Sequence, residues 1–476
     1  MLGLFGTLNL GARSLQVQRQ GVEVAGHNLA NVNNPAYARQ RLVVQTSLTV
    51  PNNLGQQGTG VDAIAIVQLR NVLVDRQIQT ETSVRGSLEA QQQALQNAQA
   101  NLGQQIDRGA SSAEGAAATQ SIGAQNGLAE NLSDLFNAFQ SLSTEPTSLT
   151  ERQVLLAKAQ NLATQFNLAS QRLDGLHTSL NDSLTDDVTQ ANELLRSIAR
   201  LNEQIVATEA GGPRLANDLR DLRQQKVEEL GQLAKIDTGE DAQGAVNISI
   251  AGESLLSGST VVDTLQTADA GGGQLLVALK SSGKNLALTG GSMQGTIEAR
   301  DGALSALQSG LNTLASQLIT EVNAVHRTGF SLSGATGENF FGGSNAADMA
   351  VNAKLAGDPG LIQAGGIAGA VGDNQTVLAL AQLAEKKIGS LNNQTFSQSY
   401  GQTVAKLGQA LASVNAQLEN QAVVESMLQR QRDAISGVSL DEEMTDMMKF
   451  QKAFEASARL IATVDSMLET VLNLKR

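Results

Sequence analysis

The residues of this chain that could carry acid–base, nucleophilic or metal chemistry are few and widely separated. The 476 residues include no cysteine, and the three histidines, His27, His177 and His326, lie far apart in helical contexts. Zinc sites of the thiolate type are therefore excluded, and each histidine is predicted to have a core or capping role. The HExxH, GxSxG and phosphate-loop patterns are absent from the sequence. We expect no catalytic, cofactor-binding or metal-binding residues.

Carboxylates in one β segment are the remaining candidates for chemistry, of the paired acid–base kind that glycosidases use. Alternation at Val246, Ile248 and Ile250, followed by short strands between Gly and Ser turns, predicts a small β domain from Asp237 to Glu298. Its acidic residues stand mostly in turns, and the segment is too short for a glycosidase cleft. An export-linked cell-wall hydrolase is thus the disfavoured alternative to a structural protein. The acidic residues are Asp237, Glu240, Asp241, Glu253 and Asp263.

Composition excludes two further classes of protein. The formal net charge of −13 argues against a nucleic-acid partner, because nucleic-acid binding needs a concentrated basic surface. No apolar run approaches the roughly 18 residues of a membrane span, so membrane insertion is not expected. Met1 to Asn9 carries no Lys or Arg, so if the protein leaves the cytoplasm, we expect it to do so without a cleaved Sec signal.

The elements that must position any function are mainly helical. The sequence predicts a mainly α fold with a small β insert, in which terminal coiled-coil helices adjoin an elongated helical-bundle domain and both ends meet at one pole. Helices are expected at 75–105, 127–236 with breaks near Pro146 and Gly211 to Pro213, 303–326, 373–388 and 395–435, and strands at 40–44, 61–67, 259–265, 274–279 and 285–288. The expected domains are 1–75 (N-terminal core), 76–236 (first helical part), 237–298 (β insert), 299–435 (second helical part) and 436–476 (C-terminal core helix).

Two apolar lines run along the first predicted helix. Two residues of an α-helix turn through about 200°, so two lines offset by two residues lie on nearly opposite faces. A helix that carries both lines therefore needs two neighbouring segments to cover them. Glycines within this helix each cost about 0.5 to 1 kcal/mol relative to Ala. We therefore expect this end to be disordered until partners cover it. One line holds Leu8, Leu15, Val22 and Leu29, and the other holds Leu10, Val17 and Val24.

The last predicted helix carries the same arrangement. We predict that its two lines, with those of the first helix, form the interface through which copies of the chain polymerise, with Leu468 beside the second line. The first line holds Leu440, Met444, Met447, Phe454 and Ile461, and the second holds Leu460, Val464, Met467, Val471 and Leu474.

Motifs at both ends resemble those of the axial proteins of the bacterial flagellum. The stretch HNLANVNNPAYARQ at 27–40 is similar to the signature shared by flagellar rod, hook and hook-associated proteins. SGVSLDEEM at 436–444, with FQKAF at 450–454 and TVLNL at 470–474, resembles the matching C-terminal end. GTIEARD at 295–301 and VNAVHRTGF at 322–330 narrow the resemblance to the hook-associated protein 1 family.

This resemblance implies a structural protein, not an enzyme, that connects the flagellar hook to the filament. The implied partners are further copies of the chain in a ring, the hook protein, hook-associated protein 3, and a flagellar export chaperone at the C-terminal region. The implied location is the hook–filament junction, reached by secretion through the flagellar type III pathway. Another axial protein, such as hook-associated protein 3 itself, is the alternative within the same class.

Two local expectations concern these motifs. The family usually has Gly where Ala36 stands, so a turn that needs positive φ would be strained here. Ser439 is predicted to cap the last helix, with Glu442 closing a capping box. For Tyr37, Arg39 and Arg41, contact with a neighbouring subunit and packing within the chain both remain open.

Overall fold

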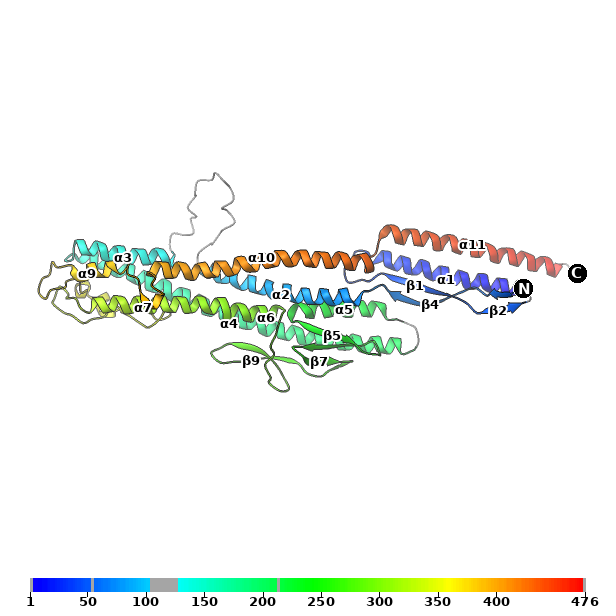
Figure 1. Cartoon of the computed structure of the whole chain (residues 1–476), viewed down its shortest axis with the longest axis horizontal. Coiled ribbons are helices and arrows are strands. Elements are labelled where there is room, and N and C mark those ends of the chain that lie inside the picture. The colour runs from blue at the N-terminus through cyan, green and yellow to red at the C-terminus, as the bar shows by residue number, and fades with distance from the viewer. Residues whose placement is uncertain (1–2, 53–54, 103–126, 212–214, 474–476) are drawn as a thin grey trace, which may run out of the picture.

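The computed structural model describes residues 3–52, 55–102, 127–211 and 215–473. Figure 1 shows a rod of long helices, with a small β segment along one side. The first and last helices lie side by side at one end of the rod, as the sequence predicts. The mainly α fold with small sheets is likewise confirmed.

The terminal unit combines two antiparallel helices with two strand pairs. The alternating segments predicted as strands pair with each other, with Gln40 opposite Gln68 and Thr46 opposite Val61. A second antiparallel pair forms between them in the sequence. The elements of this unit are α1 (Leu4–Ala30), β1 (Gln40–Thr46), β2 (Thr49–Asn52), β3 (Gly55–Gly58), β4 (Val61–Gln68) and α11 (Leu440–Asn473).

Long helices form the body, and the longest spans 61 residues, or about 90 Å. The predicted break near Pro146 is present, and the helix that follows begins where Ser148 accepts a hydrogen bond from the Glu151 backbone N–H. Along the described residues, none of the helices is both long and apolar enough to cross a membrane. The body helices are α2 (Val72–Asn101), α3 (Leu128–Thr144), α4 (Leu149–Glu209), α5 (Asn217–Leu233), α6 (Ser292–Glu298), α7 (Ser305–His326) and α10 (Phe396–Ser436).

The body helix predicted to begin at Ala303 in fact begins earlier. α6 passes through one π-helical segment, Ala299–Leu304, directly into α7. α6 packs on α2, and the Cβ that a side chain at Gly295 would carry meets the backbone of Ser87. α6 thus contacts the bundle helix α2 and, through the buried Met293, the apolar cluster that includes the strands of the β insert.

The β insert is fastened to α4 by apolar packing and by asparagine side chains. Asn192 pairs with both backbone groups of Leu265, accepting from its N–H at 2.9 Å and donating to its carbonyl at 2.8 Å. Asn202 pairs in the same way with Val246. The predicted strand at 259–265 is interrupted, and 285–288 contributes only a single bridge at Asn285. The strands are β5 (Ile236–Glu240), β6 (Val246–Ile250), β7 (Glu253–Ser257), β8 (Thr260–Val261), β9 (Leu265–Asp269) and β10 (Leu275–Leu279).

Short elements close the end of the rod opposite the termini. The helix predicted over 373–388 ends early, because the chain turns to bury Ile388 and Leu391 and pairs the backbone of Ile388 with Gln394. α10 then starts with a capping box between Thr395 and Gln398. The short elements are β11 (Phe341–Gly342), β12 (Ala350–Val351), α8 (Ala353–Gly357), η2 (Pro359–Leu361), α9 (Gln375–Gln382) and η3 (Gly389–Leu391).

Two buried polar side chains organise this end of the rod. His326 is fully buried, and its Nε2 accepts from the Gln363 N–H at 3.0 Å, so Nδ1 donates to the Glu338 carbonyl at 2.8 Å. Arg152 donates to carbonyl oxygens, among them that of Ile362 at 2.6 Å and that of Pro146 at 2.7 Å. The core role expected for His326 is confirmed.

The neutral state of His326 predicts an acid-sensitive step in stability. Burial lowers the pKa of His326 from 6.5 to about 4, so between these values the unfolded chain binds a proton that the folded chain does not. The free energy of unfolding should therefore fall by about 3 kcal/mol as the pH drops from 6.5 towards 4. Denaturant unfolding at several pH values should show this slope in the wild type and lose it in His326→Gln. His177→Gln, at a half-buried position on α4, should keep it, and an unchanged slope in His326→Gln would contradict the assignment.

Candidate assembly interface at the terminal helices

α1 and α11 approach each other closely because α1 has glycine where α11 has large side chains. A Cβ at Gly21 would lie 2.5 Å from the Phe450 ring, and a Cβ at Gly11 would lie 2.7 Å from Ile461. Between these points the hydroxyls of Ser14 and Ser457 are 2.8 Å apart. The first helix, expected to be disordered until partners cover it, therefore has one partner within the chain, since each terminal helix covers one face of the other.

The contact runs along one line of each helix. Ser14, Gly21 and Asn28 are seven residues apart, and so are their partners Ser457, Phe450 and Glu443. A spacing of seven keeps one seam facing its partner along the whole pair. This seam combines small and polar residues of α1 with Glu443, Phe450, Ser457, Ile461 and Val464 of α11, which we call the contact line.

One of the two apolar lines predicted on α1 is covered within the chain. Val17 and Val24 are buried, and Leu10, on the same face, lies against Gly60 at the start of β4. Arg13 of this face donates to Ser47 and pairs with Asp62. The line Leu10, Val17 and Val24 therefore packs towards the strands β1 and β4 and has its partner already.

Asn28 fastens the end of α1 to three other segments. Its Nδ2 donates to Glu443 Oε2 and to the Gln40 carbonyl, both at 2.9 Å. Its Oδ1 accepts from the Tyr37 hydroxyl at 2.7 Å and from the Gln40 N–H at 2.9 Å. The side chain is 1% exposed, and all four hydrogen-bonding positions of its amide are used. The Asn-rich motif thus acts as a packing hub.

Arg39 joins the loop that follows α1 to the start of α11. Its guanidinium lies 2.6 Å from the carboxylates of both Glu442 and Glu443. The backbone N–H of Arg39 donates to the Ser436 carbonyl at 2.8 Å. Glu442 therefore pairs with Arg39 instead of closing the expected capping box with Ser439. Tyr37 and Arg39 pack within the chain, whereas Arg41 is exposed.

The start of α5 holds this terminal unit against the body. Asp221 accepts from Arg70 at 2.6 Å and from the Ala38 N–H at 3.3 Å, and Arg70 also pairs with Asp75. Burial raises the pKa of Asp221 and of Asp75 above the ordinary value, and the Arg70 charge opposes the rise. One arginine thus compensates two buried carboxylates at the joint between the terminal unit and the body.

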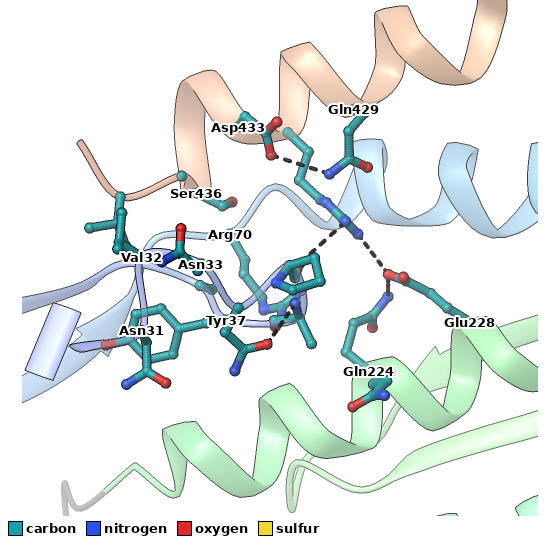
Figure 2. Close-up of a pocket in the computed structure, with 18 of the residues that line it drawn as sticks. Asn31, Val32, Asn33, Tyr37, Arg70, Gln224, Glu228, Gln429, Asp433 and Ser436 are labelled. Carbon is teal, nitrogen blue, oxygen red and sulfur yellow. Dashed lines mark hydrogen bonds and ion pairs between the residues drawn. The ribbon is translucent and has the colours of Figure 1, made fainter. Parts of the chain in front are cut away.

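Figure 2 shows a cleft of about 430 Å³ beside this joint. The loop 31–38 forms one wall, and α5 and α10 form the others, joined by an ion pair of 2.9 Å between Arg432 and Glu228. Among the described residues, those outside glycine that have positive φ are Ala251, Asn392 and Asn393. The turn at Ala36 therefore carries none of the strain that the sequence suggested.

Large apolar side chains of α11 lie on both sides of the contact line. On one side of the contact line, Leu460 and Met467 lie on the same face of α11 as Glu442 and Asp446, the two carboxylates that pair with Arg39 there. Residues on the opposite side of the line adjoin the remaining apolar line of α1. We define the first flank as Leu440, Met444, Met447 and Phe454 with Leu8, Leu15, Val22 and Leu29, and the second flank as Leu460, Met467 and Val471. Ile461, predicted on the same line as Phe454, belongs to the contact line because it faces Gly11.

Exposure divides the predicted interface residues into three groups. Val464 is buried, as are Val17 and Val24, and Leu474 lies outside the described residues. The half-buried group is Leu8, Leu10, Leu15, Val22, Leu29, Met447, Ile461 and Leu468. The exposed group is Leu440, Met444, Phe454, Leu460, Met467 and Val471.

Sequence reasoning missed one further exposed apolar stripe, on α10. Its members follow helical spacing but stand among Gln and Arg residues, so their pattern is weak in the sequence. They are Val423, Val424, Met427 and Ile435.

Four of the five acidic residues of the β insert have structural partners, and the fifth, Asp237, is exposed on β5. Glu240 pairs with Arg220, and Glu253 pairs with Lys284. Asp263 accepts from Ser281, and Asp241 caps the turn before Ala245. Within the described ranges, no group of histidine and acidic side chains is arranged to hold a metal ion.

Two family models match this chain. Residues 118–341 match the helical domain of flagellar hook-associated protein FlgK. Residues 429–474 match the C-terminal region of flagellar basal body rod FlgEFG proteins. The first match includes α4 and the β insert, and the second covers the end of α10 and all of α11.

Relatives match along nearly the whole chain. Flagellar hook-associated protein 1 of Bacillus subtilis is 26% identical over 520 residues, covering 99% of both chains. The Escherichia coli protein of that name is 22% identical and covers 98% of this chain and 99% of its own length. In fold, the chain is similar to the flagellar hook junction protein FlgK from Burkholderia pseudomallei, with a TM-score of 0.65 and 16% identity, over 76% of this chain and all of that one.

The Arg39 contacts generate a prediction about how firmly α11 is held. Arg39→Met would leave the carboxylate of Glu443, which is 3% exposed, without its cation. Loss of one partner of a buried pair should lower the free energy of opening α11 by about 3 kcal/mol. Hydrogen exchange of α11 amides should therefore quicken relative to that of α4 amides. Arg41→Met, two residues away and exposed, should exchange like the wild type. Equal exchange in both variants would show that Arg39 does not hold α11.

Proposed function

Since this chain belongs to the family of flagellar hook-associated protein 1, structural proteins of the junction between the flagellar hook and the filament, we propose that it polymerises through its paired terminal helices. The observation that carries the proposal is that α11 is apolar on both sides of its contact with α1. Met467 and Val471 are 50% and 53% exposed in the single chain. Such a surface is unfavourable in water and marks a site of interaction with another protein.

The arrangement of the two flanks suits a ring of identical copies. A ring needs two different surfaces on each copy, one for the neighbour on each side, whereas a single self-complementary surface closes a dimer. The first and second flanks lie on opposite sides of the contact line, so one copy can engage two neighbours at once. Burial of one such apolar side chain contributes about 1.5 to 3 kcal/mol, and the contribution repeats at every contact in the ring.

The remaining partners follow from family membership. We infer that the polymer stands on the hook protein, that hook-associated protein 3 joins it on the filament side, and that an export chaperone binds the C-terminal region before assembly. Secretion through the flagellar export pathway is part of the same proposal. We assign no enzymatic role, because Glu240, Glu253 and Asp263 of the β insert are each engaged with a different partner, Arg220, Lys284 and Ser281.

Charges on the second flank should separate assembly from folding. In Met467→Asp with Val471→Asp, both substituted residues are exposed in the single chain, so the unfolding temperature should stay unchanged. Leu468 is left native because it is half-buried. In a packed ring each Asp would be buried without a partner, so junction assembly should be lost. Electron microscopy of cells should then show hooks without filaments, with unpolymerised filament protein in the medium.

A matched variant places the same two charges elsewhere on the same turns of α11. Ser466→Asp with Thr470→Asp occupies exposed positions on the face away from α1, and it should support normal filaments. Secretion of both variants has to be measured alongside, because the chaperone is proposed to bind this region. Normal filaments on cells that secrete the Met467→Asp, Val471→Asp variant would refute the assembly proposal.

A further inference from the structure

Gly26 stands in α1 without any contact in the chain that explains a glycine there. Apart from its chain neighbours and the nearby backbone of α1 itself, a Cβ built at Gly26 would have no heavy atom within 4 Å among the described residues. A helix-interior glycine nevertheless costs about 0.5 to 1 kcal/mol relative to Ala. By contrast, Gly11 and Gly21 leave the space that Ile461 and Phe450 fill.

Gly26 lies on the first flank. It stands four residues after Val22 and three before Leu29, which places the three on one face of α1. By the antiparallel pairing of Asn28 with Glu443 and of Gly21 with Phe450, Gly26 is level with the part of α11 that bears the exposed Met444. The missing side chain is therefore a depression in an otherwise continuous apolar strip built from both helices.

The second flank has the opposite relief. α11 contains no glycine, and Leu460, Met467 and Val471 all project from it as exposed side chains. A depression on one flank and projecting side chains on the other are complementary to each other, whereas the second flank, which has no glycine, is not complementary to itself. This difference in surface shape favours contact between unlike flanks. Contacts between unlike surfaces of identical copies generate rings or helical tubes.

We propose that Gly26 is a socket on the first flank that receives an apolar side chain from the second flank of a neighbouring copy of this chain. The inference rests on the proposed function and specifies which surfaces meet. The strip around Gly26 continues the α1–α11 contact outward, so a third helix laid on it would be packed by both terminal helices. Each copy carries both flanks, so the same contact repeats without a second protein.

Filling the socket should block assembly without weakening the chain. Gly26→Leu adds a side chain into open space and improves helix propensity, so the unfolding temperature should stay equal or rise. Overpacking should weaken each contact between copies by about ten- to hundred-fold, and filaments should be lost. Gln16→Leu, at an exposed position of α1 outside both flanks, should assemble normally. Gly21→Leu, which collides with Phe450, should instead lower the unfolding temperature.

Cysteine cross-linking tests which flanks meet, and the chain has no cysteine of its own. Each cell strain would express a Gly26→Cys copy together with a second copy that carries Leu460→Cys, Met467→Cys or Val471→Cys. Hook–filament junctions would be isolated from these cells and oxidised. At least one pair should give disulfide-linked dimers of the two differently tagged chains, because a disulfide needs Cα atoms within about 7 Å. Gln16→Cys with the same three partners should give none.

The outcomes separate this inference from the proposed function. Normal filaments with Gly26→Leu, or dimers of Gly26→Cys with itself alone, would overturn the socket. If Met467→Asp with Val471→Asp still abolishes assembly in that case, polymerisation through α11 stands and only the socket fails. If that double variant also assembles normally, the proposed function fails first.

Discussion

The amide of Asn28 is the interaction on which the geometry of the terminal unit depends. It bonds the end of α1 to Tyr37, to both backbone groups of Gln40 and to Glu443. Because it is buried and fully used, a shorter or apolar side chain would leave several buried polar groups unpaired. The two partners of α1, the strand pair and α11, are thus oriented by one side chain. The positions of both flanks follow from that orientation.

α11 carries large apolar side chains outside its contact with α1 as well as within it. Its contact with α1 uses Glu443 and Ser457 beside Phe450, and the large residues Met444, Leu460 and Met467 face outward. Glycines in α1 let its backbone approach Phe450 and Ile461 closely, so one face of α11 suffices for the contact. The apolar surface that a single helix pair would normally bury remains available for contact between copies.

The joint to the body is held by ion pairs. Asp221 and Asp75 share Arg70, and Arg432 pairs with Glu228. Geometry-dependent ion pairs and hydrogen bonds to the loop 31–38 fix the direction in which the terminal unit leaves the body. A rod with α4 as its long axis can then carry the β insert at its side, away from the terminal pair (Figure 1).

The sequence by itself determined the local features. These are the seven-residue apolar repeat of both terminal helices, the strands β1 and β4, and the motifs that indicate a flagellar axial protein. These depend on periodicity and on neighbouring residues, which any helix or strand expresses locally. Only the tertiary structure decided which apolar line is covered, because Leu15 and Val17 are equivalent in pattern and β1 and β4 pack on the side of Val17 alone. Local sequence patterns also could not predict the ion pair between Arg39 and Glu443, which are 404 positions apart in the chain, or the one between Arg70 and Asp221. The pairing of Glu442 with Arg39 in place of the expected capping box is also a contact between distant segments of the chain.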